Sequence, residues 1–129
     1  MKTTLFTAAA VASALVWTAG AATAQSAKDF YKGKTVEIYI GYGVGGTYGK
    51  SATLIGEHLK DRIGAEAIIV KSMPGAGGLK MTNYYYNVAP KDGTALMLPP
   101  DTIVITELLK PKKAKYKSGN LTWLGAAVR

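Results

Sequence analysis

The residues best suited to chemistry in this sequence are glycines, in a loop that spans Gly41 to Gly46 and reads GYGVGG. A β-branched segment precedes this loop and a helical pattern follows it, so the backbone N–H groups of the loop would stand at the positive end of a helix dipole. Four glycines in six residues also allow positive φ angles and close approach of a ligand to the backbone. The pattern predicts an anion-binding site, although a glycine-rich turn without a ligand would have the same composition.

A second glycine-rich turn, Pro74 to Gly78, reads PGAGG and follows the next β-branched segment. Loops that follow neighbouring parallel strands meet at the carboxyl edge of a sheet, where ligands bind in open α/β folds. We therefore expect the two turns to direct their N–H groups at one point.

A dinucleotide site is the alternative for the first loop, because Gly41, Gly43 and Gly46 satisfy the G-x-G-x-x-G pattern between a strand and a helix. That pattern needs an acid at the end of the second strand to bind the ribose, and the sequence has Lys71 and Ser72 there. The sequence therefore favours a simple anion over a nicotinamide cofactor.

Groups of catalytic residues are missing from the sequence. His58 is the single histidine, and its place in a helical pattern indicates a partly exposed helix residue. The sequence has no cysteine, no G-x-S-x-G motif and no cluster with metal-ligand spacing. We predict a protein that is not an enzyme and has no metal or cofactor.

The segment from Lys110 to Lys117 holds five lysines around Tyr116. Such a segment attracts phosphate backbones in nucleic-acid-binding proteins. We interpret it as a solvated loop, because the N-terminal residues described below predict export, and we expect no nucleic-acid partner.

The apolar pattern along the chain predicts the elements that position the loops. Val36, Ile38 and Ile40 would share one face of a first strand with Tyr39 on the other, and Asp101-Thr102 would cap a last helix. One helix face would carry Ala52, Ile55, Leu59 and Ile63, and Gly64 would end that helix. The expected strands are 34–40, 67–71, 94–98 and 121–125, with helices at 48–63, 79–88 and 105–109.

This βαβαβαβ order predicts an α/β fold: a mostly parallel sheet with helices on both faces. Three loops would lie at its carboxyl edge: residues 41–47, 72–78 and 99–102.

The N-terminal residues predict export. Lys2 supplies a positive charge, Leu5 to Trp17 is an apolar run, and Ala22-Thr23-Ala24 is a cleavage pattern, so we expect a signal peptide at 1–24 that is removed after Ala24. A membrane anchor is less suitable because a spanning helix needs about 20 apolar residues.

Removal of Lys2 leaves 15 of the 16 basic residues against 8 acidic ones, so the mature chain, residues 25–129, carries a net charge of +7. In an exported protein this charge favours small acidic molecules as partners. We expect a periplasmic location.

The chain resembles the substrate-binding proteins of tripartite tricarboxylate transporters, the Bug family of periplasmic receptors. The resemblance covers essentially the whole mature chain. It rests on the first strand with its glycine loop and on three motifs: VKSMPGAGG from Val70 to Gly78, NVAPKDGT from Asn87 to Thr94, and LTWLG from Leu121 to Gly125.

This resemblance implies a type II periplasmic-binding-protein fold with two α/β domains that close around a small carboxylated solute for delivery to membrane transporter components. It implies a monomer whose two glycine loops hold a carboxylate through N–H groups and bridging waters. The implied ligand-binding residues are Tyr42, Gly43, Val44, Gly45, Gly46, Thr47, Pro74, Gly75, Ala76, Gly77, Gly78, Pro100, Asp101 and Thr102.

The sequence departs from the family at several positions. Gly41 and Gly43 stand where the family often has prolines, Gly49 stands where an acid is common, and Asp101 lies in a loop that usually offers small hydroxyl residues. Asp101 would repel a second carboxylate, pair with an amine, or cap the following helix.

The chain is also shorter than members of that family, and we expect residues 25–129 to be the first domain without the second. A chain that cannot close a cleft, and so has no ligand-binding function, is therefore the remaining alternative.

Overall fold

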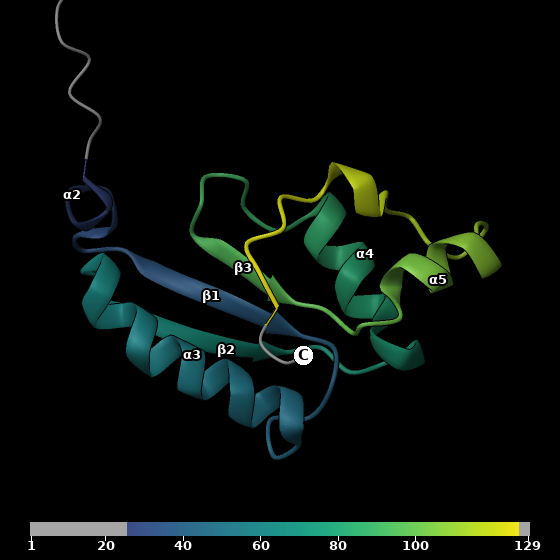
Figure 1. The fold of residues 1–129 in the computed structure, drawn as a ribbon, viewed down its shortest axis with the longest axis horizontal. Coiled ribbons are helices and arrows are strands. Elements are labelled where there is room, and N and C mark those ends of the chain that lie inside the picture. Colours follow the sequence, from purple (N-terminus) through teal and green to yellow (C-terminus); the bar gives the residue numbers. More distant parts are fainter. Residues whose placement is uncertain (1–25, 127–129) are drawn as a thin grey trace, which may run out of the picture.

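The computed structural model describes residues 26–126, in which strands and helices alternate around a parallel sheet (Figure 1). The predicted signal peptide lies outside the described residues. The elements in order are α2 (Ala27–Tyr31), β1 (Thr35–Ile40), α3 (Thr47–Ile63), β2 (Ala67–Ser72), the 3₁₀ turn η2 (Ala76–Gly78), α4 (Leu79–Asn87), β3 (Ala95–Leu98), α5 (Ile103–Leu109) and the 3₁₀ turn η3 (Ser118–Asn120). No helix among these residues is long and apolar enough to span a membrane.

The sheet has the strand order β2-β1-β3, and β1 pairs in parallel with both neighbours. Ile40 at the end of β1 stands opposite Ser72 of β2 and Leu98 of β3, so the three strands end level with one another. The loops that follow them leave the sheet at the same edge, as predicted.

Helices cover both faces of the sheet, which confirms the predicted fold class (Figure 1). Alternate residues of β1 point to opposite faces. Ile38 and Ile40 form a core cluster with Ala52 of α3, whereas Tyr39 packs with Met81 of α4 on the other face.

The predicted face of helix α3 is only partly buried: Ala52 is buried, and Leu59 and Ile63 are half-buried. Its buried residues are Gly49, Ala52 and Gly56, while Ile55 remains 36% exposed. A Cβ on Gly56 would lie 3.2 Å from Cγ2 of Ile68, so the helix approaches β2 closely at a residue without a side chain. Gly64 ends the helix as predicted, with φ of 71° and an N–H that donates to Lys60.

The predicted fourth strand is wrong, because residues 121–126 form no strand in the structure. Leu121 packs against the cluster of Leu79, Ile103 and Tyr116. The Trp123 indole N–H donates to the Ser118 carbonyl at 3.2 Å. These contacts hold the segment against η3 and α5 rather than in a strand ladder beside β3.

Candidate functional site

The three predicted loops approach one another closely at the carboxyl edge of the sheet. A Cβ on Gly41, directly after β1, would lie 2.6 Å from Cα of Gly78. A Cβ on Gly78 would in turn lie 2.4 Å from Cγ of Pro100, in the loop after β3. Gly78 therefore sits between the other two loops, and no larger residue fits there without moving one of them.

The turn after β2 depends on backbone angles that favour glycine. The φ angles of Gly75, Ala76, Gly77 and Gly78 are 146°, 51°, 65° and 87°, so four consecutive residues have positive φ. Ala76 is a non-glycine residue in this region, where L-residues are uncommon. The N–H of Gly78 donates to the Gly75 carbonyl at 3.0 Å, which closes the turn immediately before α4.

The first loop does not use the positive φ angles that its glycines allow. Within Gly41–Gly46 no residue has positive φ, and a Cβ on Gly43 or Gly45 would meet no atom within 4 Å. Only Gly41 is required by packing. The Ser72 hydroxyl donates to the Tyr42 carbonyl at 2.8 Å and so joins this loop to the end of β2.

Gly49 is explained by the way the first loop folds back on α3. A Cβ at this position would lie 1.9 Å from the Val44 carbonyl oxygen. An acid therefore cannot occupy position 49 with this loop conformation. The glycine at this position is therefore explained by packing.

Helices α3 and α4 both begin at this edge without a side-chain cap. Their N-cap residues are Gly46 and Gly78, and neither helix has an acidic residue in its first turn. Helix α2 at the other end of β1 differs, since the Ser26 side chain caps it and Asp29 lies in its first turn. The first N–H groups of α3 are therefore open to an external anion, whereas those of Leu79 and Lys80 in α4 already donate to the Ala76 and Gly75 carbonyls of the preceding turn.

The loop after β3 divides into a packed and an exposed part. Pro100 is buried against Gly78, whereas Asp101 and Thr102 are exposed. The interpretation of Asp101-Thr102 as a side-chain cap is wrong: Thr102 occupies the N-cap position, but no side chain makes a capping hydrogen bond there. Asp101 is left as an exposed charge beside the candidate site.

Lys80 lies beside the second glycine turn and is absent from the ligand-binding residues predicted from the sequence. Cβ and Cδ of Lys80, in the first turn of α4, lie 3.4 and 3.3 Å from the position of a Cβ on Gly75. Its position could have been recognised from the sequence, because Lys80 follows by two residues a glycine turn that precedes a helix. Of the predicted residues, 42–47 and 74–77 are exposed, and Gly78 and Pro100 are buried spacers.

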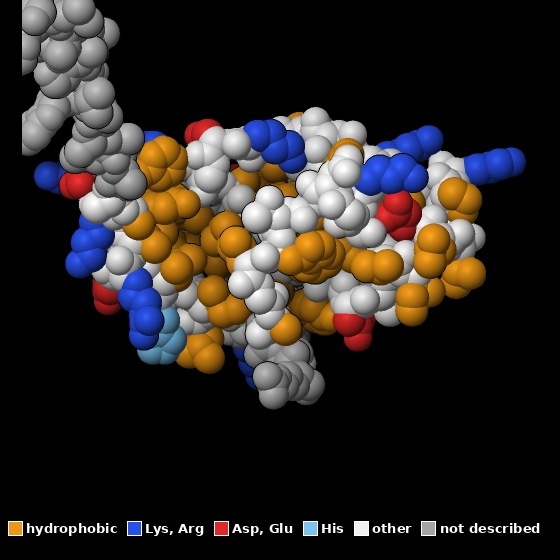
Figure 2. All heavy atoms as spheres, turned by 45° about the horizontal axis from the view of Figure 1, so that its top comes forward, with side chains coloured by type: hydrophobic (Ala, Val, Ile, Leu, Met, Phe, Trp, Pro, Cys, Tyr) orange, Lys and Arg blue, Asp and Glu red, His pale blue; other side chains and the backbone are white. Residues whose placement is uncertain are grey.

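A wide hollow lies beside the first residue of the third loop, Pro99, and away from the two glycine turns. It has a volume of about 980 Å³ and runs beside β3, between Ile55 and Leu59 of α3 and residues 120–126. None of the predicted ligand-binding residues lines it. Figure 2 shows hydrophobic side chains gathered along this side of the molecule. The predicted loops therefore form an open edge rather than a closed pocket.

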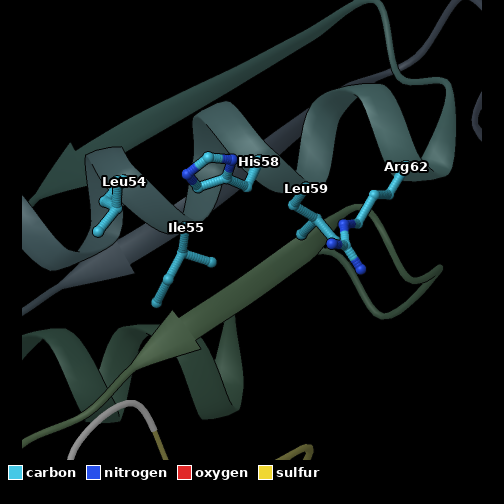
Figure 3. A pocket seen from close by; sticks show the side chains of 5 residues that line it. All are labelled: Leu54, Ile55, His58, Leu59 and Arg62. Carbon is cyan, nitrogen blue, oxygen red and sulfur yellow. The ribbon is translucent and has the colours of Figure 1, made fainter.

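His58 lies on the outer surface of α3, as its pattern predicted. It is exposed and borders a shallow hollow of about 330 Å³, together with Leu54, Ile55, Leu59 and Arg62 (Figure 3). Among the described residues no group of three or more His, Cys, Asp and Glu side chains is arranged to hold a metal ion.

One group of ionisable side chains lies on the α4 face of the sheet. The Tyr39 hydroxyl donates to Glu37 at 2.5 Å, and the Lys71 ammonium lies 3.2 Å from the same carboxylate. The hydrogen bond from Tyr39, followed by Lys71, lowers the pKa of Glu37. The same hydrogen bond raises the pKa of Tyr39. Lys71 therefore forms an ion pair over the face of the sheet near the end of β2, and its ammonium group is not directed at the candidate loops.

No protein-family model matches the chain, and neither the curated proteins nor the solved structures include a significant match to it. The resemblance to the Bug family therefore stays a prediction from the sequence motifs.

Proposed function

We propose that the chain is a non-catalytic periplasmic solute receptor that binds a small organic carboxylate for a tripartite tricarboxylate-type transporter. The observation that carries the proposal is the pair of uncapped helix starts at one sheet edge, each preceded by a glycine turn and without an acid in its first turn. The carboxylate donors are the N–H groups after Gly46 and those of the exposed turn residues 75–77. Lys80 adds a cation beside the second turn.

The strength of this site depends on how far it is shielded from water. A helix terminus contributes about 0.3–1 kcal/mol toward an exposed anion, whereas micromolar affinity requires about −8 kcal/mol. The loop residues are exposed, so the chain by itself binds carboxylates weakly. A second domain of the kind that the resemblance implies would strengthen the interaction by excluding water.

Backbone amide NMR shifts test the proposal directly. Titration with di- and tricarboxylates, aromatic acids and amino acids is expected to shift the N–H signals of residues 43–49 and 75–80 with the best ligand. Sodium chloride at equal ionic strength is the control for screening. If every acid in the panel leaves these signals unchanged, the proposed site is wrong.

The dinucleotide alternative needs a different result. NADH fluorescence should change on mixing only if Gly41, Gly43 and Gly46 bind a dinucleotide. The structure offers this alternative little support, because the end of β2 carries the paired Lys71 and Ser72, whose hydroxyl is bonded to the first loop. We therefore expect no change in NADH fluorescence.

A further inference from the structure

Helix α5 leaves most of its apolar side chains in solvent. The exposed fractions of Val104, Ile105, Leu108 and Leu109 are 45%, 58%, 76% and 74%. Residues four apart are neighbours on a helix, so the pairs 104/108 and 105/109 form one continuous apolar side. Ile103 is the only buried residue of α5. Single exposed leucines are ordinary on protein surfaces, but a contiguous set of four marks an interaction surface.

The five lysines that follow α5 lie in a segment with an ordered backbone. Side chains of α4 fix it: Asn83 donates to the Lys113 carbonyl and accepts from the Lys115 N–H, and Asn87 donates to the Lys115 carbonyl. Tyr116 is 2% exposed, and its hydroxyl donates to the Ile103 carbonyl at 2.8 Å. The segment is therefore anchored between its lysines, whose side chains are all exposed.

Glu107 joins the end of the lysine segment back to α5. Its carboxylate accepts hydrogen bonds from the N–H and the hydroxyl of Ser118, and it pairs with Lys117 at 3.4 Å. Residues 103–120 contain five lysines and this single acid, so most of the positive charge has no acidic counterpart within the segment. Figure 2 shows hydrophobic side chains at the end of the molecule that α5 forms, with lysine side chains projecting beside them.

We propose that this α5–lysine surface binds the face of an anionic membrane, with Val104, Ile105, Leu108 and Leu109 inserted among the headgroups and lysines 110, 112, 113, 115 and 117 facing lipid phosphates. Apolar side chains beside lysines are the composition of surfaces that bind at a lipid interface. A second copy of the chain is a poorer partner because it would bring lysines against lysines. The proposal does not depend on carboxylate binding at the glycine loops.

Co-sedimentation with lipid vesicles tests the proposal. The chain is purified without residues 1–24, and mass spectrometry verifies its N-terminus so that the apolar leader does not contribute. It is then mixed with vesicles of phosphatidylcholine alone or with added phosphatidylglycerol. We expect binding to the anionic vesicles that weakens with added salt. The double variant Leu108→Glu/Leu109→Glu and the triple variant Lys112→Gln/Lys113→Gln/Lys115→Gln should each bind at least about tenfold more weakly.

Matched controls separate this surface from general effects of charge. Leu54→Glu/Val88→Glu changes two exposed apolar residues elsewhere, and Lys32→Gln/Lys50→Gln/Lys60→Gln removes three exposed lysines elsewhere. Both controls should retain most of the binding, and circular dichroism should show every variant folded. The proposal is overturned if the wild-type chain stays in the supernatant, or if test and control variants lose binding equally. Light scattering that shows self-association lost in Leu108→Glu/Leu109→Glu, or capture only by an acidic protein, would also overturn it.

Discussion

Gly78 is the residue on which the arrangement of the three loops depends. It combines a φ of 87° with contact to Gly41 on one side and Pro100 on the other. A side chain at this position would meet both a strained backbone and an occupied space. Gly43 in the first loop has neither restriction.

We therefore expect Gly78→Ala to lower the free energy of unfolding by about 1–3 kcal/mol, the cost of a strained backbone residue, with a further loss from the Pro100 contact. Gly43→Ala should leave stability unchanged or raise it by about 0.4–1 kcal/mol, because it restricts the unfolded chain. Urea unfolding of both variants checks the difference. Equal effects would mean that the packing at Gly78 does not hold the loops together.

The Glu37 carboxylate gives the fold a defined acid sensitivity. Its pKa is lowered in the folded chain from the ordinary value of 4.5, so it contributes stability above that pH and loses it as the pH falls through the lower folded value. Tyr39→Phe removes the main cause of the shift. The difference in unfolding free energy between neutral pH and a pH below the folded pKa should therefore be smaller in Tyr39→Phe than in the wild type.

Tyr85→Phe is the matched control, since the Tyr85 hydroxyl donates to the Ala95 carbonyl rather than to a carboxylate. This variant should lose the same stability at both pH values in urea unfolding. Identical pH dependence in Tyr39→Phe and the wild type would contradict the assignment to Glu37.

Helix α3 begins without a side-chain cap and without an acidic residue in its first turn. Gly46 has the extended conformation of an N-cap residue, with φ of −82° and ψ of −179°. A Cβ there would lie 3.6 Å from its nearest neighbour, the Gly43 carbonyl oxygen, so a short side chain fits. An aspartate at this position would satisfy the same N–H groups that we propose for the ligand.

The variant Gly46→Asp should consequently raise stability and weaken carboxylate binding at the same time. The gain is expected to be about 0.3–1 kcal/mol, from the charge at the helix terminus. Gly46→Asn also offers a side-chain oxygen to the N–H groups but adds no charge, so it should weaken binding less. Thermal unfolding and NMR titration on the same samples measure both effects. Unchanged carboxylate binding in Gly46→Asp would show that the start of α3 is not the site.

On each face of the sheet, the helices leave one of the two outer strands only partly covered. On the α4 face of the sheet, β2 carries the Lys71–Glu37 ion pair. On the α3 face, β3 presents Leu96 and Leu98, which are only partly buried and border the 980 Å³ hollow. Charged residues protect an outer strand from association. The uncharged β3 edge should therefore bind apolar partners more readily than the β2 edge.

We expect the folded chain to bind the apolar dye 1-anilinonaphthalene-8-sulfonate in this hollow. Leu124→Glu places a charge in its lining and should reduce the dye fluorescence strongly, whereas Leu108→Glu, which lies outside the hollow, should reduce it less. Fluorescence titration of each variant at neutral pH provides the measurement. Equal reduction by the two variants would mean that the dye does not bind in the hollow.

The sequence by itself determined the order of the elements from β1 to α5, the parallel sheet and the edge at which the loops lie. These features follow from local patterns: β-branched runs, helical periodicity, and glycine and proline at the turns. Local patterns predicted the end of α3 at Gly64 for the same reason, since the left-handed cap is a property of one residue.

Only the tertiary structure decided which glycines are required, how deeply each residue of α3 is buried, and what becomes of residues 121–126. Gly41 and Gly78 are needed because atoms distant along the chain occupy the space beside them, and Gly49 is needed because the preceding loop folds back on it. The spacing of residues in the sequence carries no information about that space. In the segment predicted as a fourth strand, Leu121 packs with Tyr116 and the Trp123 indole donates to Ser118 instead. Whether an apolar run becomes a strand depends on a neighbouring strand with free backbone groups in reach, and that is a property of the folded chain.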